Sequence, residues 1–156
     1  PDKEAGPVSA GIETIVEPAG LARVRAMLAA GGQPPIGETL RFALVEADLG
    51  SAIFEGVPGP HAYNPMGIVH GGYAATLLDS ACGIATATRL DADQSFTTLE
   101  LKVAYHKAMT DRTGPVRAEG KVVSMGRRVA YAEARLTDTA GTLLASATST
   151  LLVMSA

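Results

Sequence analysis

Several residue types are scarce in this chain of 156 residues, and each shortage argues against a class of protein. The only cysteine, Cys82, cannot form an intrachain disulfide or a cysteine-based zinc site. The three histidines show no ligand spacing such as His-x-x-x-His. The chain also lacks a Gly-x-Ser-x-Gly elbow and the glycine fingerprints of nucleotide-binding loops. We therefore expect no metal, no redox cofactor and no serine triad.

Strong charge and long apolar runs are also missing. Thirteen basic and sixteen acidic residues give a net charge of -3, which provides no general attraction for nucleic acid or an anionic membrane. No uncharged apolar stretch approaches the roughly 20 residues that span a bilayer, because Asp79 interrupts the best candidate. The first ten residues lack the basic and then apolar regions of a signal peptide. We therefore expect a cytoplasmic protein without a nucleic-acid or membrane partner.

The composition, 47% hydrophobic and 19% charged, is typical of one compact soluble domain. Residues 1–38 are expected to form an N-terminal arm and a short helix, with Leu21, Val24 and Leu28 at helical spacing before a stop at 31–32. Residues 39–156 are expected to form the main domain.

The order of the remaining elements predicts an α+β architecture. A hairpin around residues 48–50 and a Pro- and Gly-rich loop over 58–69 precede a helix from 71 to about 88. The pattern then alternates, and four residues, Leu99, Leu101, Val103 and Tyr105, are expected to share one strand face. Further strands are predicted over 115–124, 128–138 and 142–154, with turns at 125–126 and 139–141. The helix is so apolar that the antiparallel sheet is expected to curl around it.

Asp79 is the single carboxylate in this apolar helix. Burial disfavours a charged carboxylate and raises its pKa, so this position needs a reason. A catalytic acid or base is one interpretation, and a hydrogen-bonded structural aspartate is the other.

The start of the same helix reads His70-Gly71-Gly72. His70 stands where an N-cap belongs, and the first amides of a helix have no intrahelical acceptor. These amides can bind an anion, or a carbonyl oxygen that is becoming one. Gly71 would let a substrate approach the backbone closely, or the glycines could permit tight packing, and both interpretations stay open.

Five residues at fixed spacing carry a family resemblance: Asn64, His70, Gly71, Gly72 and Asp79. The pattern Asn-x5-His-Gly-Gly, with an acidic residue nine positions after the histidine, resembles the hotdog-fold acyl-CoA thioesterases of the phenylacetate-degradation type. The resemblance extends from about residue 39 to the end of the chain and does not include the first 38 residues. It implies a hotdog fold, in which an antiparallel sheet wraps a long central helix.

The resemblance also implies roles. The Gly71 N–H would polarise the thioester carbonyl, Asn64 would position that carbonyl or the attacking water, and Asp79 would act as general base or nucleophile. Thr98 would help to hold the water, although Thr97 is a close alternative. His70 would shape the helix start through hydrogen bonds.

Coenzyme A needs a site for its phosphates, and the turn Ser124–Arg128 offers one. Gly126 would permit close approach, and Arg127 and Arg128 would bind phosphate. Gly72 and Ser124 are further candidate contacts for the substrate. The alternative is a solvated basic turn.

We therefore expect hydrolysis of an acyl-CoA to a free acid and CoA. The alternatives are an acyl-carrier-protein thioesterase, a 3-hydroxyacyl thioester hydratase and a non-catalytic acyl-thioester binding module. Of the two enzymes, the hydratase is the less favoured.

Gly71 and Asp79 are eight residues apart, or about 12 Å along the helix, too far to act on one carbon. A two-fold homodimer with antiparallel helices would join them across the interface, and the resemblance implies that dimers pair into a homotetramer.

Overall fold

The computed structural model describes residues 16–156, so most of the predicted N-terminal arm lies outside the described residues. The elements of this part of the chain are α1 (Ala19–Ala29), α2 (Pro35–Leu40), β1 (Phe42–Asp48), β2 (Ser51–Gly56), a short 3-10 helix (Pro60–Ala62), α3 (Gly71–Ala87), β3 (Gln94–Tyr105), β4 (Val116–Met125), β5 (Val129–Asp138) and β6 (Leu143–Ser155). The predicted helices, hairpin, strands and turns are all present.

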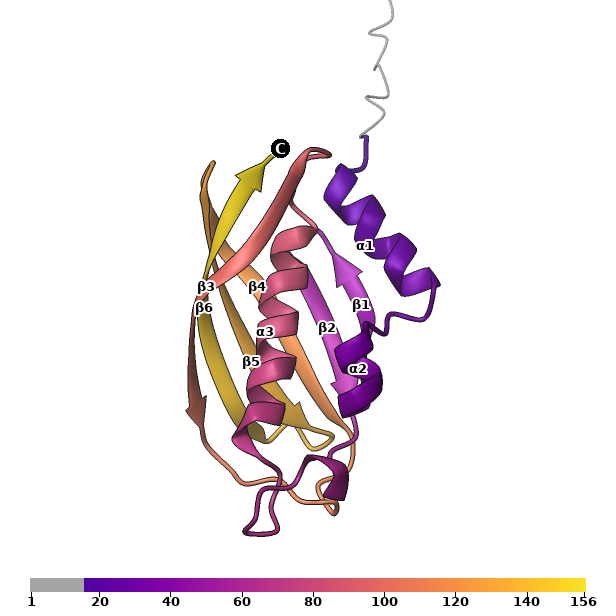
Figure 1. The fold of residues 1–156 in the computed structure, drawn as a ribbon, viewed down its shortest axis with the longest axis vertical. Helices are drawn as coiled ribbons and strands as arrows, with labels where there is room; N and C mark the ends of the chain where they lie inside the picture. Colours follow the sequence, from indigo (N-terminus) through magenta and orange to yellow (C-terminus); the bar gives the residue numbers. More distant parts are fainter. Residues whose placement is uncertain (1–15) are drawn as a thin grey trace, which may run out of the picture.

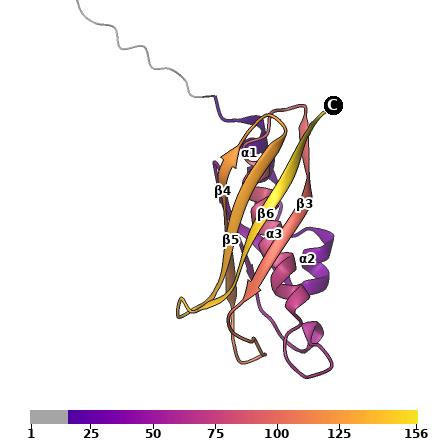
Figure 2. The ribbon, with the colours of Figure 1, turned by 90° about the vertical axis from the view of Figure 1, so that its left-hand side faces the viewer.

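The strands form one antiparallel sheet of six, in the order β1-β2-β4-β5-β6-β3. The sheet curves around α3, which crosses its concave face (Figure 1). The view turned by 90° shows the sheet and α3 as two layers (Figure 2). This arrangement confirms the predicted hotdog fold.

The helix α3 supplies much of the hydrophobic core. Leu77, Leu78 and Ala81 are fully buried, as the apolar sequence predicts. Gly120 of β4 lets the helix approach the sheet closely, because a Cβ atom there would lie 2.3 Å from the Ala81 carbonyl oxygen. No helix in the described part of the chain is both long and apolar enough to cross a membrane.

The helices α1 and α2 flank the edge of the sheet at β1 (Figure 1). The Gly20 N–H donates to the Leu90 carbonyl at 2.9 Å, which ties α1 to the segment after α3. The sequence did not predict α2, a single turn and a half that begins with Pro35 at its first position. This helix spans the predicted domain boundary between residues 38 and 39. The division of the chain at that boundary remains a prediction.

The strand β3 contains a bulge that overturns part of the predicted strand face. Thr98 pairs with Leu151 and Glu100 pairs with Thr150, so Leu99 has no partner and its side chain is 58% exposed. The prediction that Leu99 lies on the face of Leu101 and Val103 is therefore wrong. The extra residue instead keeps Thr98 on the face that contacts α3.

Candidate active site

The loop before α3 is held by its own hydrogen bonds. The Asn64 side-chain oxygen accepts from the N–H groups of Met66, at 3.0 Å, and Ile68, at 3.4 Å. The Asn64 N–H in turn donates to the Ile68 carbonyl at 2.8 Å. Because its side-chain oxygen is occupied, Asn64 has only its amide nitrogen left, and that atom can only donate.

His70 is the N-cap of α3, as predicted. Its Nδ1 accepts from the Gly72 N–H at 2.8 Å, and its carbonyl accepts from the Tyr73 N–H at 2.9 Å. The His70 N–H donates to the Ala62 carbonyl at 2.7 Å. An Nδ1 that accepts places the proton of the neutral ring on Nε2, so Nδ1 cannot also serve as a base.

The Gly71 N–H differs from its neighbours at the start of α3. Of the first three amides of this helix, those of Gly72 and Tyr73 both donate to His70. The amide of Gly71 has no acceptor within residues 16–156. One backbone donor at the positive end of the helix dipole is thus left for an oxygen atom of a ligand.

Side chains occupy the space that the two glycines leave. A Cβ atom at position 71 would lie 3.0 Å from the Tyr105 side chain, and one at position 72 would lie 2.9 Å from His70 Nδ1. A side chain at either position would therefore require a neighbouring side chain to shift. The free Gly71 N–H is a separate feature of the backbone.

A hollow of about 310 Å³ lies between the start of α3 and the end of β3. Its lining is mainly apolar and includes Asn64, Ile68, Gly71, Ala74, Tyr105 and Met109. A concave apolar site with a few polar groups is typical of small-molecule binding.

Asp79 lies half-buried near the middle of α3. Its Oδ1 accepts from the Thr98 hydroxyl at 2.9 Å, whereas the neighbouring Thr97 is exposed. Of the two predicted threonines, the structure brings Thr98 to the carboxylate.

The buried Cys82 is not a nucleophile. Burial, with smaller contributions from Asp79 and Glu133, raises the pKa of its thiol to about 12.

Gly71 and Asp79 are not brought together within one chain. Both lie on the straight α3, separated by eight residues or about 12 Å along its axis. Within one chain the predicted site residues therefore fall into two separate groups, here called half-sites, one with Asn64 and Gly71 and the other with Asp79 and Thr98.

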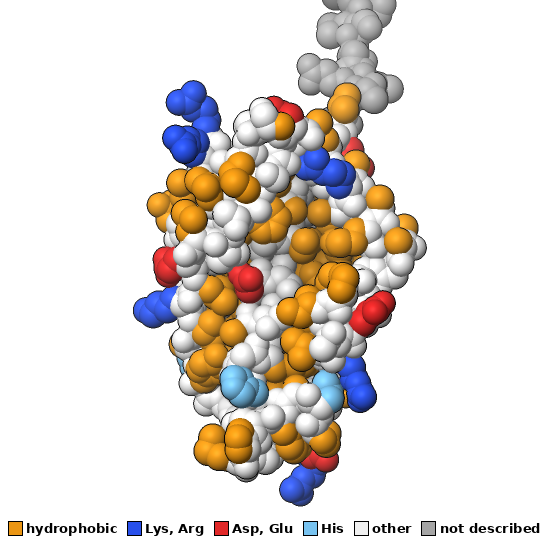
Figure 3. Space-filling model, viewed as in Figure 1, with side chains coloured by type: hydrophobic (Ala, Val, Ile, Leu, Met, Phe, Trp, Pro, Cys, Tyr) orange, Lys and Arg blue, Asp and Glu red, His pale blue; other side chains and the backbone are white. Residues whose placement is uncertain are grey.

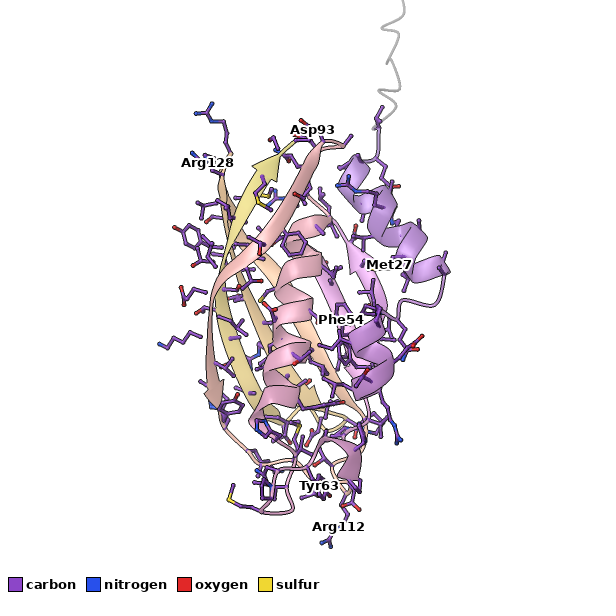
Figure 4. All side chains as sticks on the ribbon, viewed as in Figure 1. Met27, Phe54, Tyr63, Asp93, Arg112 and Arg128 are labelled. Carbon is purple, nitrogen blue, oxygen red and sulfur yellow. The ribbon has the colours of Figure 1, made fainter. Side chains whose placement is uncertain are left out.

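The predicted CoA turn lies at the far end of the molecule from the start of α3. Figure 4 shows Arg128 at one end and Tyr63, which precedes Asn64, at the other. Ser124, Gly126, Arg127 and Arg128 are all exposed, and neither arginine forms an ion pair within the described residues. A shallow hollow of about 420 Å³ at this turn is lined by Gly126, Arg127 and also Arg89.

The sequence analysis gave no site role to two residues of these regions, Tyr105 and Arg89. Tyr105 was assigned only to a strand face, but its hydroxyl donates to the Gly71 carbonyl at 2.9 Å. Arg89 follows α3 directly, and its proximity to the turn depends on the fold. Across residues 16–156, no three His, Cys, Asp or Glu side chains are placed to hold a metal ion.

Known proteins resemble this chain in sequence and in structure. The family model described as the thioesterase superfamily matches residues 66–145, just over half of the chain. A 1,4-dihydroxy-2-naphthoyl-CoA hydrolase of Listeria monocytogenes is 27% identical over 116 residues, which are 74% of this chain and 93% of the relative.

Solved structures of other proteins also resemble this chain. A conserved protein of Pseudomonas aeruginosa is 27% identical with a TM-score of 0.73, and the match covers 80% of this chain and 98% of that one. A phenylacetic acid degradation-related protein of Ralstonia eutropha JMP134 is 26% identical with a TM-score of 0.71, and the match covers 81% and 97%. The chain therefore belongs to the thioesterase superfamily and is a thioester hydrolase.

Proposed function

We propose that this enzyme hydrolyses an acyl-CoA thioester to a free acid and CoA. The observation that carries the proposal is the Gly71 N–H, which has no acceptor within residues 16–156 although the next two amides of the helix are bonded. The Listeria relative is named as a CoA hydrolase, which favours CoA over a carrier protein as the thiol. The phenylacetate-degradation subtype, the cytoplasmic location and the activity of residues 39–156 are parts of the same proposal.

The start of α3 would bind the thioester carbonyl oxygen. The Gly71 N–H donates to this oxygen, and the amide nitrogen of Asn64 is free to act as a second donor. Both donors become stronger as negative charge develops on the oxygen. One such donor is typically worth about 10²–10³ in rate.

Asp79 would act on the carbonyl carbon, in one of two ways. As a general base, it takes a proton from water while the water oxygen attacks; the C–S bond then breaks, and the sulfur takes that proton from Asp79 and leaves as the CoA thiol. As a nucleophile, its oxygen forms an acyl anhydride and expels the thiolate, and water then cleaves the anhydride. The Thr98 hydroxyl orients the carboxylate in both cases.

The complete site would form between two chains. Because the half-sites are about 12 Å apart along α3, Asp79 of one chain would face Asn64 and Gly71 of a second chain with an antiparallel helix. Figure 3 shows hydrophobic side chains over much of the face that carries α3, a surface suited to a substrate and a second chain. We propose a homodimer with shared sites, with dimers paired into a tetramer.

The CoA phosphates would bind at the β4–β5 turn. Arg127 and Arg128 are exposed and have no acidic partner among the described residues. Arg127 and Arg89 line the hollow at this turn, and Asp91 is the acidic residue in the same lining. Gly126 allows a phosphate to approach the backbone, and the Ser124 hydroxyl adds a polar contact. Gly72, at the start of α3, would lie against the pantetheine arm.

Release of free thiol from a panel of short, medium, long and aryl acyl-CoAs tests this proposal. The same acyl groups on acyl-carrier protein and on N-acetylcysteamine are the comparison substrates. We expect turnover of at least one acyl-CoA, with a lower KM than the N-acetylcysteamine ester because the phosphates are bound. Preference for the carrier protein would identify the alternative thiol carrier. Binding of acyl-CoA without turnover of any substrate would contradict hydrolysis and favour a binding module.

A further inference from the structure

We propose that Tyr105 is a positioning residue, whose hydroxyl holds the first peptide of α3 so that the Gly71 N–H points into the hollow. The inference rests on the proposed role of this N–H in thioester hydrolysis. It concerns the end of β3 and the start of α3, two segments that are 34 residues apart in the sequence and meet through one hydrogen bond.

The start of α3 needs external support. Two successive glycines begin this helix, and glycine favours the helical conformation less than alanine does. Helix ends also fray more readily than helix centres. A donor that stabilises a transition state must instead be fixed before the reaction, because its orientation determines its effect.

The peptide between Gly71 and Gly72 is held on both sides. Its carbonyl accepts from the Tyr105 hydroxyl at 2.9 Å, and its N–H donates to His70 Nδ1 at 2.8 Å. A carbonyl oxygen has two lone pairs, so the tyrosine bond can add to the bond of the helix itself. The adjoining Gly71 N–H belongs to the His70–Gly71 peptide, which is joined to this one through φ and ψ of Gly71. Holding the Gly71–Gly72 peptide therefore removes one of the motions that would redirect that N–H.

The tyrosine contact differs in kind from the other two supports. His70 and Ala62 belong to the segment that leads into the helix, so their bonds are local in the sequence. Tyr105 belongs to β3, where it pairs with Ala145 of β6, so it connects the helix start to the sheet. The end of its side chain also packs closely against Gly71, 3.0 Å from where a Cβ atom of that residue would be.

The same bonds form one polarised chain. The Tyr105 O–H donates to the Gly71 carbonyl, and the Gly72 N–H of that peptide donates to His70 Nδ1. Each bond strengthens the next in such a chain. Loss of the hydroxyl is therefore expected to weaken the bond from Gly72 to His70 as well, which provides a second observable.

The test compares Tyr105→Phe with Tyr131→Phe. The first substitution removes the hydroxyl and retains the ring that lines the hollow. Tyr131 is 51% exposed on β5, and its hydroxyl has no partner within residues 16–156, so its variant is a matched control. For the full-length protein, we expect Tyr105→Phe to lower kcat about three- to tenfold, the effect of one neutral hydrogen bond. We expect a smaller change in KM and the same loss for every acyl group, whereas the control retains the kcat of the parent.

Amide hydrogen exchange measured by NMR gives a readout that does not depend on turnover. Faster exchange of the Gly72 N–H in Tyr105→Phe, without a change in the melting temperature, is the expected result. Equal kcat and equal Gly72 exchange in Tyr105→Phe and Tyr131→Phe would overturn the proposal, as would a lower melting temperature with unchanged kcat per folded site. If the parent hydrolyses no thioester, the proposed function fails, and the exchange result alone decides whether Tyr105 fixes the peptide.

Discussion

The start of α3 and the β4–β5 turn lie at opposite ends of the molecule and are built in opposite ways. At the start of α3, the groups around Gly71 are held by bonds to His70, Ala62 and Tyr105, and the Gly71 N–H has no acceptor within residues 16–156. At the turn, Arg127 and Arg128 are exposed and make no ion pair within the described chain.

This difference matches the two functions proposed for these regions. Stabilisation of a transition state needs donors fixed in advance, because a small displacement removes much of the effect. Recognition of phosphates needs only cations within reach, and long arginine side chains can adapt to them. Substitutions at the helix start should therefore change kcat, and those at the turn should change KM.

Asp79→Asn should have the largest effect, because it removes the base or nucleophile that both mechanisms require. We expect kcat to fall by about 10²–10⁴ while the circular dichroism spectrum stays the same. The matched control is Asp48→Asn, at an exposed carboxylate whose turn bond to Leu49 an amide oxygen can still accept. Parent-like activity of Asp79→Asn would refute the mechanism, and an unfolded variant would indicate a structural aspartate.

Gly71→Ala, at the start of α3, should lower activity without lowering stability by much. The new Cβ atom would lie 3.0 Å from Tyr105, so the exposed ring must move and its bond to the Gly71 carbonyl is disturbed. We expect kcat to fall on the order of tenfold, since the donor is misdirected. Alanine favours a helix by up to about 1 kcal/mol, so the free energy of unfolding should not fall by much. Urea denaturation checks this, and a large loss of stability with normal kcat would contradict the account.

Arg127→Ala and Arg128→Ala should weaken binding without slowing the chemical step. Exposed charge contacts contribute about 0.2–1 kcal/mol each, so we expect KM for acyl-CoA to rise by roughly 1.4- to fivefold per variant. The effect should shrink at high salt and disappear with N-acetylcysteamine esters, which carry no phosphate. Arg135→Ala is the control, because Arg135 is an exposed arginine in the middle of β5 that forms no ion pair within residues 16–156. An unchanged KM in the double variant would place the phosphates elsewhere.

Thiol alkylation should have no measurable effect. Burial and the nearby Asp79 carboxylate raise the pKa of Cys82 to about 12, so at pH 8 the thiol stays protonated and does not react. Iodoacetamide should therefore label the unfolded chain and leave the folded enzyme active. Rapid inactivation of the folded enzyme would show that Cys82 is accessible.

The sequence predicted the fold well because its signals are local. The apolar stretch from Gly71 determines α3, and glycine-rich turns separate strands whose alternation is clear. The prediction failed for Leu99, since a bulge depends on how β3 pairs with β6 and not on the pattern of β3 alone. α2 was missed because a helix of six residues has too little periodicity.

The site was predictable where its residues are close in sequence. His70 as N-cap follows from its place before two glycines, and Asp79 is conspicuous as the one charge in an apolar helix. The contacts of Thr98 with Asp79 and of Tyr105 with Gly71 join β3 to α3, and only the folded chain determines them. The same holds for Arg89, which meets the turn through tertiary structure.

The central claim, that one site takes Asp79 from one chain and Asn64 from another, is tested most directly by mixing two inactive variants. Asp79→Asn and Asn64→Ala are refolded separately and together, and heterodimers are confirmed by mass spectrometry of differently tagged chains. A shared site predicts that the mixture regains activity, because each heterodimer contains one site with both defects and one with neither. If both residues act within one chain, every site keeps a defect, and a mixture that contains heterodimers but stays inactive would contradict the claim.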